Sequence, residues 1–529
     1  MPLVEERKSL LYKLEPISKR WPAVTKPEGH VHFRSKLMWS LGSLLVYFVL
    51  ANVFIYGLSP TNIDAFAGFR AILAGASGSL VHLGIGPIVT GSIIMQLFAG
   101  AKIIKLDLTK PEDKAVYQGV QKLLVLVMIF VESIPQVFGF LPPDANFVAK
   151  INTYEGPLAS FFVGNGDAWA KTAIVAQLAV GSYLVFLMDE VVSKWGLGSG
   201  ISLFIAAGVS QALFTGLVNW IPQSEGAWSI ANPPTGVLPK TFYLLNEFST
   251  AQLIGGGGFE RILLAPPNPI IALVATIITF MIVVYVESSR VELPLAHGKV
   301  RGARGRYPIR LLYASNIPVI LAGALLANVN LIGLLLWHGG PLQNLPFIGK
   351  QEWVGGYQPG TTTAISGIAY YLSVPAGVQD WLLPFLSPQY GGVLLYRESW
   401  QIILHILMYA AFMIGGSILF AVFWIETTNM GPEKVASQIE KSGMQIPGFR
   451  RDPRVTGKIL ERYIPVVTVI GGAAIGALAV FADLLGTVGN AGGTGVLLTV
   501  GIFQRLYEQI AKEQAMEMHP VLRGFFGER

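Results

Sequence analysis

The sequence predicts an all-α, polytopic membrane protein. Of its 529 residues 52% are hydrophobic and only 13% are charged, whereas soluble domains carry about 25% charged residues. The mean hydropathy is +0.53. The apolar residues are gathered into long runs, and a helix needs about 20 such residues to cross the hydrocarbon core of a bilayer.

The first apolar run, 37–58, follows a charged segment that contains Pro16, Pro22 and Pro27. It is long enough to span the membrane and is not expected to be a cleaved signal peptide. Nine further runs follow it. The ten predicted spans are 37–58, 84–101, 116–139, 169–189, 200–220, 268–287, 311–335, 398–425, 463–484 and 493–513.

The distribution of Lys and Arg predicts the orientation of these spans. With the N-terminus in the cytosol, the cytosolic segments total 145 residues and hold 30 Lys and Arg, whereas the outer segments total 146 residues and hold 5. Such an excess is typical of cytoplasmic loops. We therefore expect both termini to be cytosolic.

Ten spans divide into two halves, 1–220 and 268–529, which are joined by an external loop at 221–267 that we interpret as a hinge. Because each half has an odd number of spans, the second enters the membrane from the opposite face. Halves of this kind form inverted repeats, with any shared site at their interface.

The segment 62–83 is apolar but does not fit a simple span. It contains Asp64, Arg70 and His82, and Pro87 shortly after it suits the first turn of a new helix. We interpret 62–83 as a short re-entrant or external helix. Non-spanning backbone at membrane depth is tolerated only against protein or a water-filled cavity, so this segment indicates a pore. A plain amphipathic connector remains the alternative.

The sequence shows no sign of catalytic or cofactor chemistry. It has no cysteine, and it lacks the phosphate-binding loop, zinc-protease and serine-hydrolase motifs. We expect neither an enzyme nor a bound cofactor or metal. Lys122 and Glu132 lie within the third span, and Glu132 is expected to line a cavity or lie near the interface. Because such charges are few, an ion-coupled carrier and an intramembrane enzyme are the weaker alternatives.

Two cytosolic loops, 288–310 and 427–462, are long, basic and rich in Gly and Pro. Arginine guanidinium groups suit phosphate partners, so an RNA surface is one candidate partner. A role limited to topology or to contact with anionic lipid is the other reading. The arginines concerned are Arg301, Arg304, Arg306, Arg450 and Arg451.

Four stretches spread over the chain carry a resemblance to a known family. They are GIGPIVTGSIIMQLFAG at 84–100, KWGLGSGISLFIAAGVSQ at 194–211, VELPLAHGKVRGARGRYPIRLLYASNIPVIL at 291–321 and GTGVLLTVGIFQRLYEQI at 493–510. Together they resemble the SecY family, the central subunit of the Sec protein translocon, in its archaeal and eukaryotic form.

The resemblance implies ten spans in two inverted halves around an hourglass pore. It assigns 62–83 to a plug, which includes Phe66, Phe69, Arg70, Ile72 and Leu73. It assigns an apolar pore ring to Ile85, Val89, Ile201, Ile205, Ile320 and Leu498, and a lateral gate to Thr90 and Asn328. The spacing of Ile85 and Val89, and of Ile201 and Ile205, places each pair on one face of a helix.

The resemblance also implies a function and partners. The expected function is a protein-conducting channel that moves secretory polypeptides across the membrane and releases hydrophobic helices sideways into lipid. The expected partners are SecE-like and Sec-beta-like small subunits, signal sequences, nascent polypeptides and a ribosome that binds the two basic loops and supplies the driving force. The expected location is the cell membrane. No role is assigned to the external stretches 140–168 and 336–397.

Overall fold

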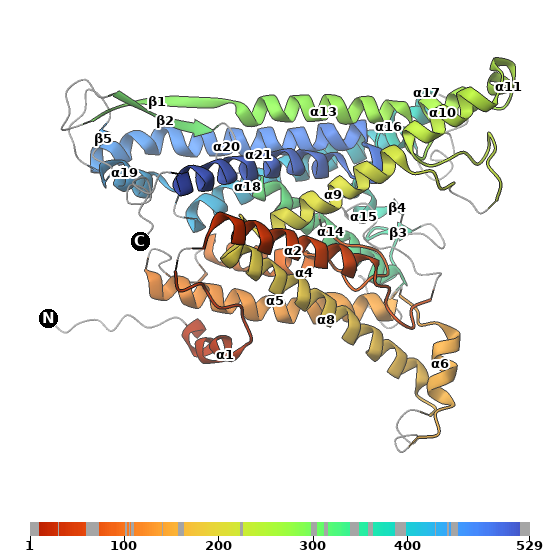
Figure 1. The fold of residues 1–529 in the computed structure, drawn as a ribbon, viewed down its shortest axis with the longest axis horizontal. Coiled ribbons are helices and arrows are strands. Elements are labelled where there is room, and N and C mark those ends of the chain that lie inside the picture. Colours follow the sequence, from red (N-terminus) through yellow and green to blue (C-terminus); the bar gives the residue numbers. More distant parts are fainter. Residues whose placement is uncertain are drawn as a thin grey trace.

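The chain folds into a bundle of long helices whose axes run in broadly the same direction (Figure 1). The computed structural model describes residues 10–29, 31–59, 73–100, 103–104, 106, 110–139, 141–156, 163–222, 226–297, 304–310, 316–338, 349–357, 363–386, 398–428, 430–441, 444–445 and 453–518.

Each of the ten predicted spans corresponds to one long helix. In the first half these helices are α2 (Phe33–Asn52), α4 (Gly86–Gly100), α5 (Pro111–Gly139), α8 (Gly166–Trp195) and α9 (Gly200–Val218). In the second half they are α13 (Ile270–Ser288), α14 (Ile317–His338), α18 (Ser399–Thr427), α20 (Pro453–Leu485) and α21 (Gly493–Met518). Among the described residues, seven of these helices are long and apolar enough to cross a membrane, and they are α5, α8, α9, α13, α14, α18 and α20.

Shorter elements connect the long helices. In the first half they are η1 (Leu10–Leu14), α1 (Glu15–Arg20) and α6 (Ala145–Asn152), and between the halves they are α10 (Val237–Glu247), α11 (Thr250–Gly255) and α12 (Gly258–Leu263). In the second half they are β1 (Arg290–His297), β2 (Arg304–Arg310), β3 (Gly356–Tyr357), β4 (Ala364–Ser366), α15 (Gly367–Tyr371), α16 (Val378–Trp381), α17 (Leu383–Leu386), α19 (Pro432–Lys441), β5 (Met444–Gln445) and η5 (Val488–Asn490).

The first predicted span extends beyond the C-terminal end of the observed helix. Helix α2 stops at Asn52 instead of residue 58, because the backbone beyond it pairs with another segment. The Ile55 N–H donates to the Gly78 carbonyl at 2.9 Å, and the Leu80 N–H donates to the Val53 carbonyl at 2.9 Å. This pairing ties the end of α2 to residues 73–85, which we call the connector.

The connector differs from the helix expected for 62–83. Residues 60–72 lie outside the described part of the chain, Leu73 is helical, and 74–83 form turns and irregular backbone in place of a continuous helix. The connector is nevertheless deeply buried, with Val81 and Leu83 at most 1% exposed. Helix α4 follows this buried segment and has only 15 residues, about 22 Å at 1.5 Å per residue.

Both basic loops contain more regular structure than their Gly and Pro content indicated. In the first loop β1 pairs antiparallel with β2. In the second, α19 packs Val435 and Ile439 against Leu460 of α20, and α20 starts ten residues before the predicted span. Strand β5 then pairs with β1, with Ala296 opposite Gln445, so one sheet joins the two loops.

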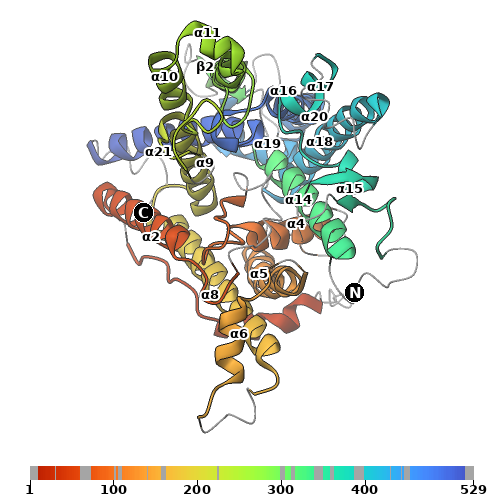
Figure 2. The same ribbon diagram turned by 90° about the vertical axis from the view of Figure 1, so that its right-hand side faces the viewer.

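The bundle has two distinct ends. Strands β1, β2 and β5, helix α19 and the first and last described residues of the chain lie at one end, which we call the terminal end (Figure 1). Helices α6, α10 and α11 and strands β3 and β4 lie at the opposite end. Seen along the bundle, the first and second halves occupy largely opposite sides and meet in the middle (Figure 2).

Candidate functional site: an apolar constriction between the two halves

The apolar residues predicted to form a ring meet where the two halves face each other. Ile85, Val89, Ile205, Ile320 and Leu498 belong to one buried cluster, and none of them is more than 6% exposed. They come from the start of α4, from α9, from α14 and from α21, which are far apart in sequence. The structure therefore brings together five of the six predicted positions.

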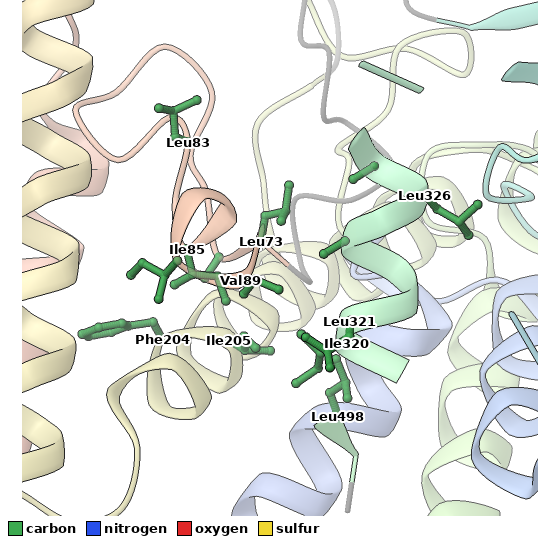
Figure 3. Close-up of a cluster of buried hydrophobic side chains, with 14 of the residues drawn as sticks. Leu73, Leu83, Ile85, Val89, Phe204, Ile205, Ile320, Leu321, Leu326 and Leu498 are labelled. Atoms are coloured by element: carbon green, nitrogen blue, oxygen red, sulfur yellow. The ribbon is translucent and has the colours of Figure 1, made fainter. Parts of the chain in front are cut away.

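The sixth position, Ile201, is half-buried and packs against the same cluster. It lies one turn before Ile205 on α9, and both point to the same face of that helix. In Figure 3 the side chains of Ile205, Ile320 and Leu498 approach one another, while Val89 and Leu73 lie beside them. Branched apolar side chains from several helices thus fill the middle of the bundle.

The connector closes the constriction from one side. Leu73 is 3% exposed within the same cluster, and its carbonyl accepts a hydrogen bond from the Ile85 N–H at 2.7 Å. Gly84 has a φ of +56°, and a Cβ there would lie 2.1 Å from the Leu73 carbonyl oxygen. Only glycine adopts this conformation and allows this approach at little cost. Of the five predicted plug residues, Leu73 is described, whereas Phe66, Phe69, Arg70 and Ile72 lie outside the described residues.

A buried carboxylate positions the helix that carries Leu498. The Asp483 carboxylate, 3% exposed at the end of α20, accepts hydrogen bonds from the Thr494 N–H at 3.0 Å and the Thr494 hydroxyl at 2.5 Å. It also accepts one from the Tyr409 hydroxyl at 2.7 Å. A carboxylate at the first turn satisfies backbone N–H groups that have no partner within the helix. The sequence analysis did not predict this role, because it depends on residues 74 and 11 positions away.

One polar contact joins the two halves beside the ring. The Asn328 side-chain amide on α14 donates to the Thr90 hydroxyl on α4 at 3.1 Å, and the Thr90 hydroxyl donates to the Gly86 carbonyl at 3.0 Å. Both predicted gate residues are therefore in contact. Helix α4 also packs against α18, so it meets two helices of the other half.

Glu132 lies close to this contact. Its side chain is 3% exposed, and a Cβ at Gly86 would lie 3.0 Å from one Glu132 carboxylate oxygen. The side chain is buried where its own helix, α5, meets the start of α4. The expectation of a cavity-lining or interfacial position stays a prediction. Lys122, in contrast, forms an ion pair with Glu190 of α8.

A cavity of about 440 Å³ lies next to the ring on the side of the terminal end. Val89, Ile201 and Ile320 form part of its wall, so the ring is its floor. Polar side chains such as Gln121 and Ser202 also line it, although most of the exposed lining surface is apolar. A chamber that ends at an apolar constriction is a poor path for ions.

The basic loops are described in part. Arg304 and Arg306 lie on β2, where they pair with Ala296 and Pro294 of β1. Arg301, Arg450 and Arg451 lie outside the described residues. The pairing of β1 with β5 places the two loops side by side at the terminal end.

These features define a class of protein: a polytopic α-helical membrane protein with two halves that close on an apolar central constriction. Comparison with known sequences gives the family. The SecY family pattern matches residues 79–507, and the pattern described as the plug domain of Sec61p matches residues 45–78. The chain belongs to the SecY family.

Relatives and solved structures agree with this assignment. The chain is 46% identical over 521 residues to the protein translocase subunit SecY of Archaeoglobus fulgidus, covering 98% of this chain and 99% of that protein. It is 39% identical over 515 residues to the corresponding protein of Methanocaldococcus jannaschii, covering 96% and 98%. A structure described as a protein conducting channel is 38% identical, with a TM-score of 0.73 and coverage of 96% and 98%. Sec61 in a canine ribosome-channel complex from the endoplasmic reticulum is also 38% identical, with a TM-score of 0.70 and coverage of 96% and 98%.

Proposed function

We propose that this chain is the pore-forming subunit of a protein-conducting channel, through which secretory polypeptides cross a membrane. The observation that carries the proposal is the buried apolar cluster in the middle of the bundle, which contains residues of α4, α9, α14 and α21 from both halves. Relatives named protein translocase subunit SecY and structures of protein-conducting channels support it.

The ring explains how a polypeptide could pass while ions are retained. A narrow apolar constriction tends to lose its water, which raises the barrier for ions. The side chains of Val89, Ile205, Ile320 and Leu498 make few polar contacts and can part around an extended chain and close again. In this proposal the segment 62–83 is the plug that blocks the pore at rest, and the burial of Leu73 within it supports that role.

The contact between the halves would be the lateral gate. Parting α4 from α14 would break the hydrogen bond between Asn328 and Thr90 and open a path from the ring to lipid. Hydrogen bonds between membrane helices contribute about 0.6 kcal/mol on average, so this one would be easy to break. The loop 221–267 is the proposed hinge between the halves 1–220 and 268–529.

The terminal end would face the cytosol of a cell whose plasma membrane holds the channel. The excess of Lys and Arg in the segments at that end supports this orientation. The joined basic loops there would bind the ribosome, and a ribosome-bound channel among the similar structures supports such a partner. SecE-like and Sec-beta-like subunits, signal sequences and membrane lipid complete the proposed set of partners.

A disulfide test would locate the polypeptide path. The chain has no cysteine, so a single Ile320→Cys substitution reports only on the ring. A cysteine in a stalled secretory chain should form a disulfide with it, and the bond should be absent when the secretory chain lacks its signal sequence.

The matched control is Ile470→Cys on α20, because that isoleucine is 52% exposed on the outer surface of the bundle. It should give no disulfide. If neither Ile320→Cys nor Val89→Cys reacts with the stalled chain, a polypeptide does not pass through the ring, and an ion-coupled carrier becomes the function to pursue.

A further inference from the structure

The segment between the two halves forms a small hairpin with a core of its own. Helices α10, α11 and α12 bury Leu244, Leu253 and Ile262 against one another. The Lys240 ammonium on the inner face of α10 donates to the Pro267 carbonyl at 2.6 Å. The inner face of α10, with Lys240 and Leu244, therefore packs inside this segment.

The other face of α10 is apolar and uncovered. Leu238, Phe242 and Leu245 are 54%, 64% and 55% exposed, and their spacing places them in one row along the helix. We call this row the α10 stripe. A helix whose outer face meets water normally carries polar residues there, so the stripe needs another environment.

The stripe begins where a membrane-spanning helix ends. The Gly236 N–H, next to α10, donates to the Asn219 carbonyl at the end of α9 at 2.8 Å. The next residues, Trp220 and Ile221, are 51% and 69% exposed, and the Trp220 ring stacks on that of Trp228 at 6.2 Å. Exposed tryptophans of this kind gather at the boundary between lipid and water.

The hairpin also lies at the edge of the molecule. Figure 2 shows α10 and α11 at the rim, away from the centre of the bundle. Residues 236–265 contain only four charged residues, Lys240, Glu247, Glu260 and Arg261, and none of them lies in the stripe. The apolar surface of the spanning helices thus continues along α10 without a charged break.

We propose that α10 lies in the surface of the lipid leaflet at the opposite end of the bundle, with Leu238, Phe242 and Leu245 inserted among the lipid chains. Amphipathic helices of this kind bury their apolar face about 5–10 Å into the boundary of the leaflet. Lipid is the occupant because the stripe continues the membrane-facing surface of α9. The proposal depends only on the membrane-spanning fold, so it stands or falls independently of protein conduction.

Spin labels can test this placement because the chain has no cysteine of its own. Phe242→Cys and Glu247→Cys would each be labelled in the full chain, purified with any subunits that remain bound and reconstituted into vesicles of phosphatidylcholine and phosphatidylglycerol. Glu247 is the matched control because it lies on the same helix, is exposed and points away from the stripe. Collisions with oxygen, which concentrates in lipid, would be compared with collisions with a water-soluble nickel chelate.

The label at 242 should collide several-fold more with oxygen than with the nickel chelate, and the label at 247 should show the reverse. Leu238→Cys should behave like Phe242→Cys. Equal nickel access at 242 and 247 would show that the stripe faces water and would overturn the proposal. A label at 242 that is immobile and shielded from both reagents would also overturn it, because another protein would then cover the stripe.

Discussion

At the residue scale, a few polar groups among apolar side chains set the geometry of the constriction. Asn328 and Thr90 join α14 to α4, Asp483 holds the first turn of α21, and Gly84 lets the connector turn beside Leu73. Each of these residues acts through a specific bond or a close approach. Substitutions at these positions should therefore change the closing of the pore more than the assembly of the bundle.

A double-mutant cycle should detect the bond between Thr90 and Asn328. Thr90→Val and Asn328→Ala each remove one partner, and the Asn328 amide keeps its bond to the Ala324 carbonyl when Thr90 is changed. We expect a coupling energy of about 0.6 kcal/mol and no more than about 2 kcal/mol, measured by unfolding in a membrane mimic. Strictly additive effects of the two substitutions would show that the contact does not stabilise the closed gate.

The buried Lys240 should make the stability of the hairpin depend on pH. Burial, aided by the nearby Arg261, lowers its pKa to about 8 from 10.5. Between these pH values the unfolded chain binds more protons at this position than the folded chain, so stability rises with pH. Unfolding measured from pH 8 to 10.5 should show this rise for the native chain relative to Lys240→Met, and parallel curves for the two chains would contradict it.

At the element scale, short irregular segments place the long helices. The connector precedes the short helix α4 and brings Ile85 and Val89 to the ring. The turn between α20 and α21 fixes the position of Leu498 along the bundle. The Gly489 N–H in that turn donates to the Asn268 side-chain oxygen before α13 at 2.7 Å. These segments hold the helices that line the pore in register with one another.

Removing the Asp483 carboxylate should loosen α21. In Asp483→Ala the Tyr409 hydroxyl and the Thr494 N–H lose their acceptor, and each unsatisfied buried group costs about 1–3 kcal/mol. We expect a lower unfolding temperature together with a raised ion conductance, because Leu498 lies about one turn beyond Thr494.

Two matched variants separate the contributions to this effect. Tyr409→Phe removes a single donor and should cost about 1 kcal/mol, and Asp483→Asn keeps one acceptor oxygen and should lie between the two. Wild-type conductance in Asp483→Ala, despite a loss of stability, would limit Asp483 to a structural role.

At the scale of the whole molecule, the two halves meet on an apolar centre while one end of the bundle gathers the basic loops. Helices of both halves contribute to one hydrophobic cluster, and β1 and β5, whose paired residues are more than 140 positions apart, unite the two loops. In the proposed function, this arrangement combines a seal in the membrane with a docking surface outside it. Two measurements on the whole channel test these two parts.

Polar substitutions in the ring should make the resting channel leak. Ile205→Ser together with Ile320→Ser would allow water to enter the constriction, so the ion conductance of reconstituted channels should rise. Ile403→Ser with Ile470→Ser is the matched control, since both isoleucines are more than half exposed. Equal conductance in the two pairs would mean that the ring is not the ion seal.

Charge reversal in the basic loops should weaken ribosome binding. Replacing Arg304, Arg306, Arg450 and Arg451 with glutamate removes contacts to polyanionic RNA, and the residual binding should depend less on salt concentration. Co-sedimentation with ribosomes over a range of salt concentrations would measure this. Lys150→Glu, at the opposite end, should bind as the native chain does, and unchanged binding by the fourfold variant would leave the loops a purely topological role.

The sequence by itself determined the class of fold, the number of spans and the excess of positive charge on one side. These follow from the lengths of the apolar runs and from counts of charged residues, and both can be read directly from the local sequence. The family resemblance then selected the ring positions, and the structure brings five of the six into one buried cluster. The end of the first span and the burial of Glu132 could not be predicted, since both depend on contacts with the connector or with α4.

Hydrophobicity by itself does not determine which apolar residues face the centre, and only the tertiary structure shows it. Ile320 and Ile332 lie on the same helix, α14, yet the first is 6% exposed and the second 55%. In a bilayer both environments are apolar, so hydrophobicity does not separate a pore-facing residue from a lipid-facing one. The same holds for the acceptor role of Asp483 and the pairing of β1 with β5, because each requires partners that only the folded chain brings together.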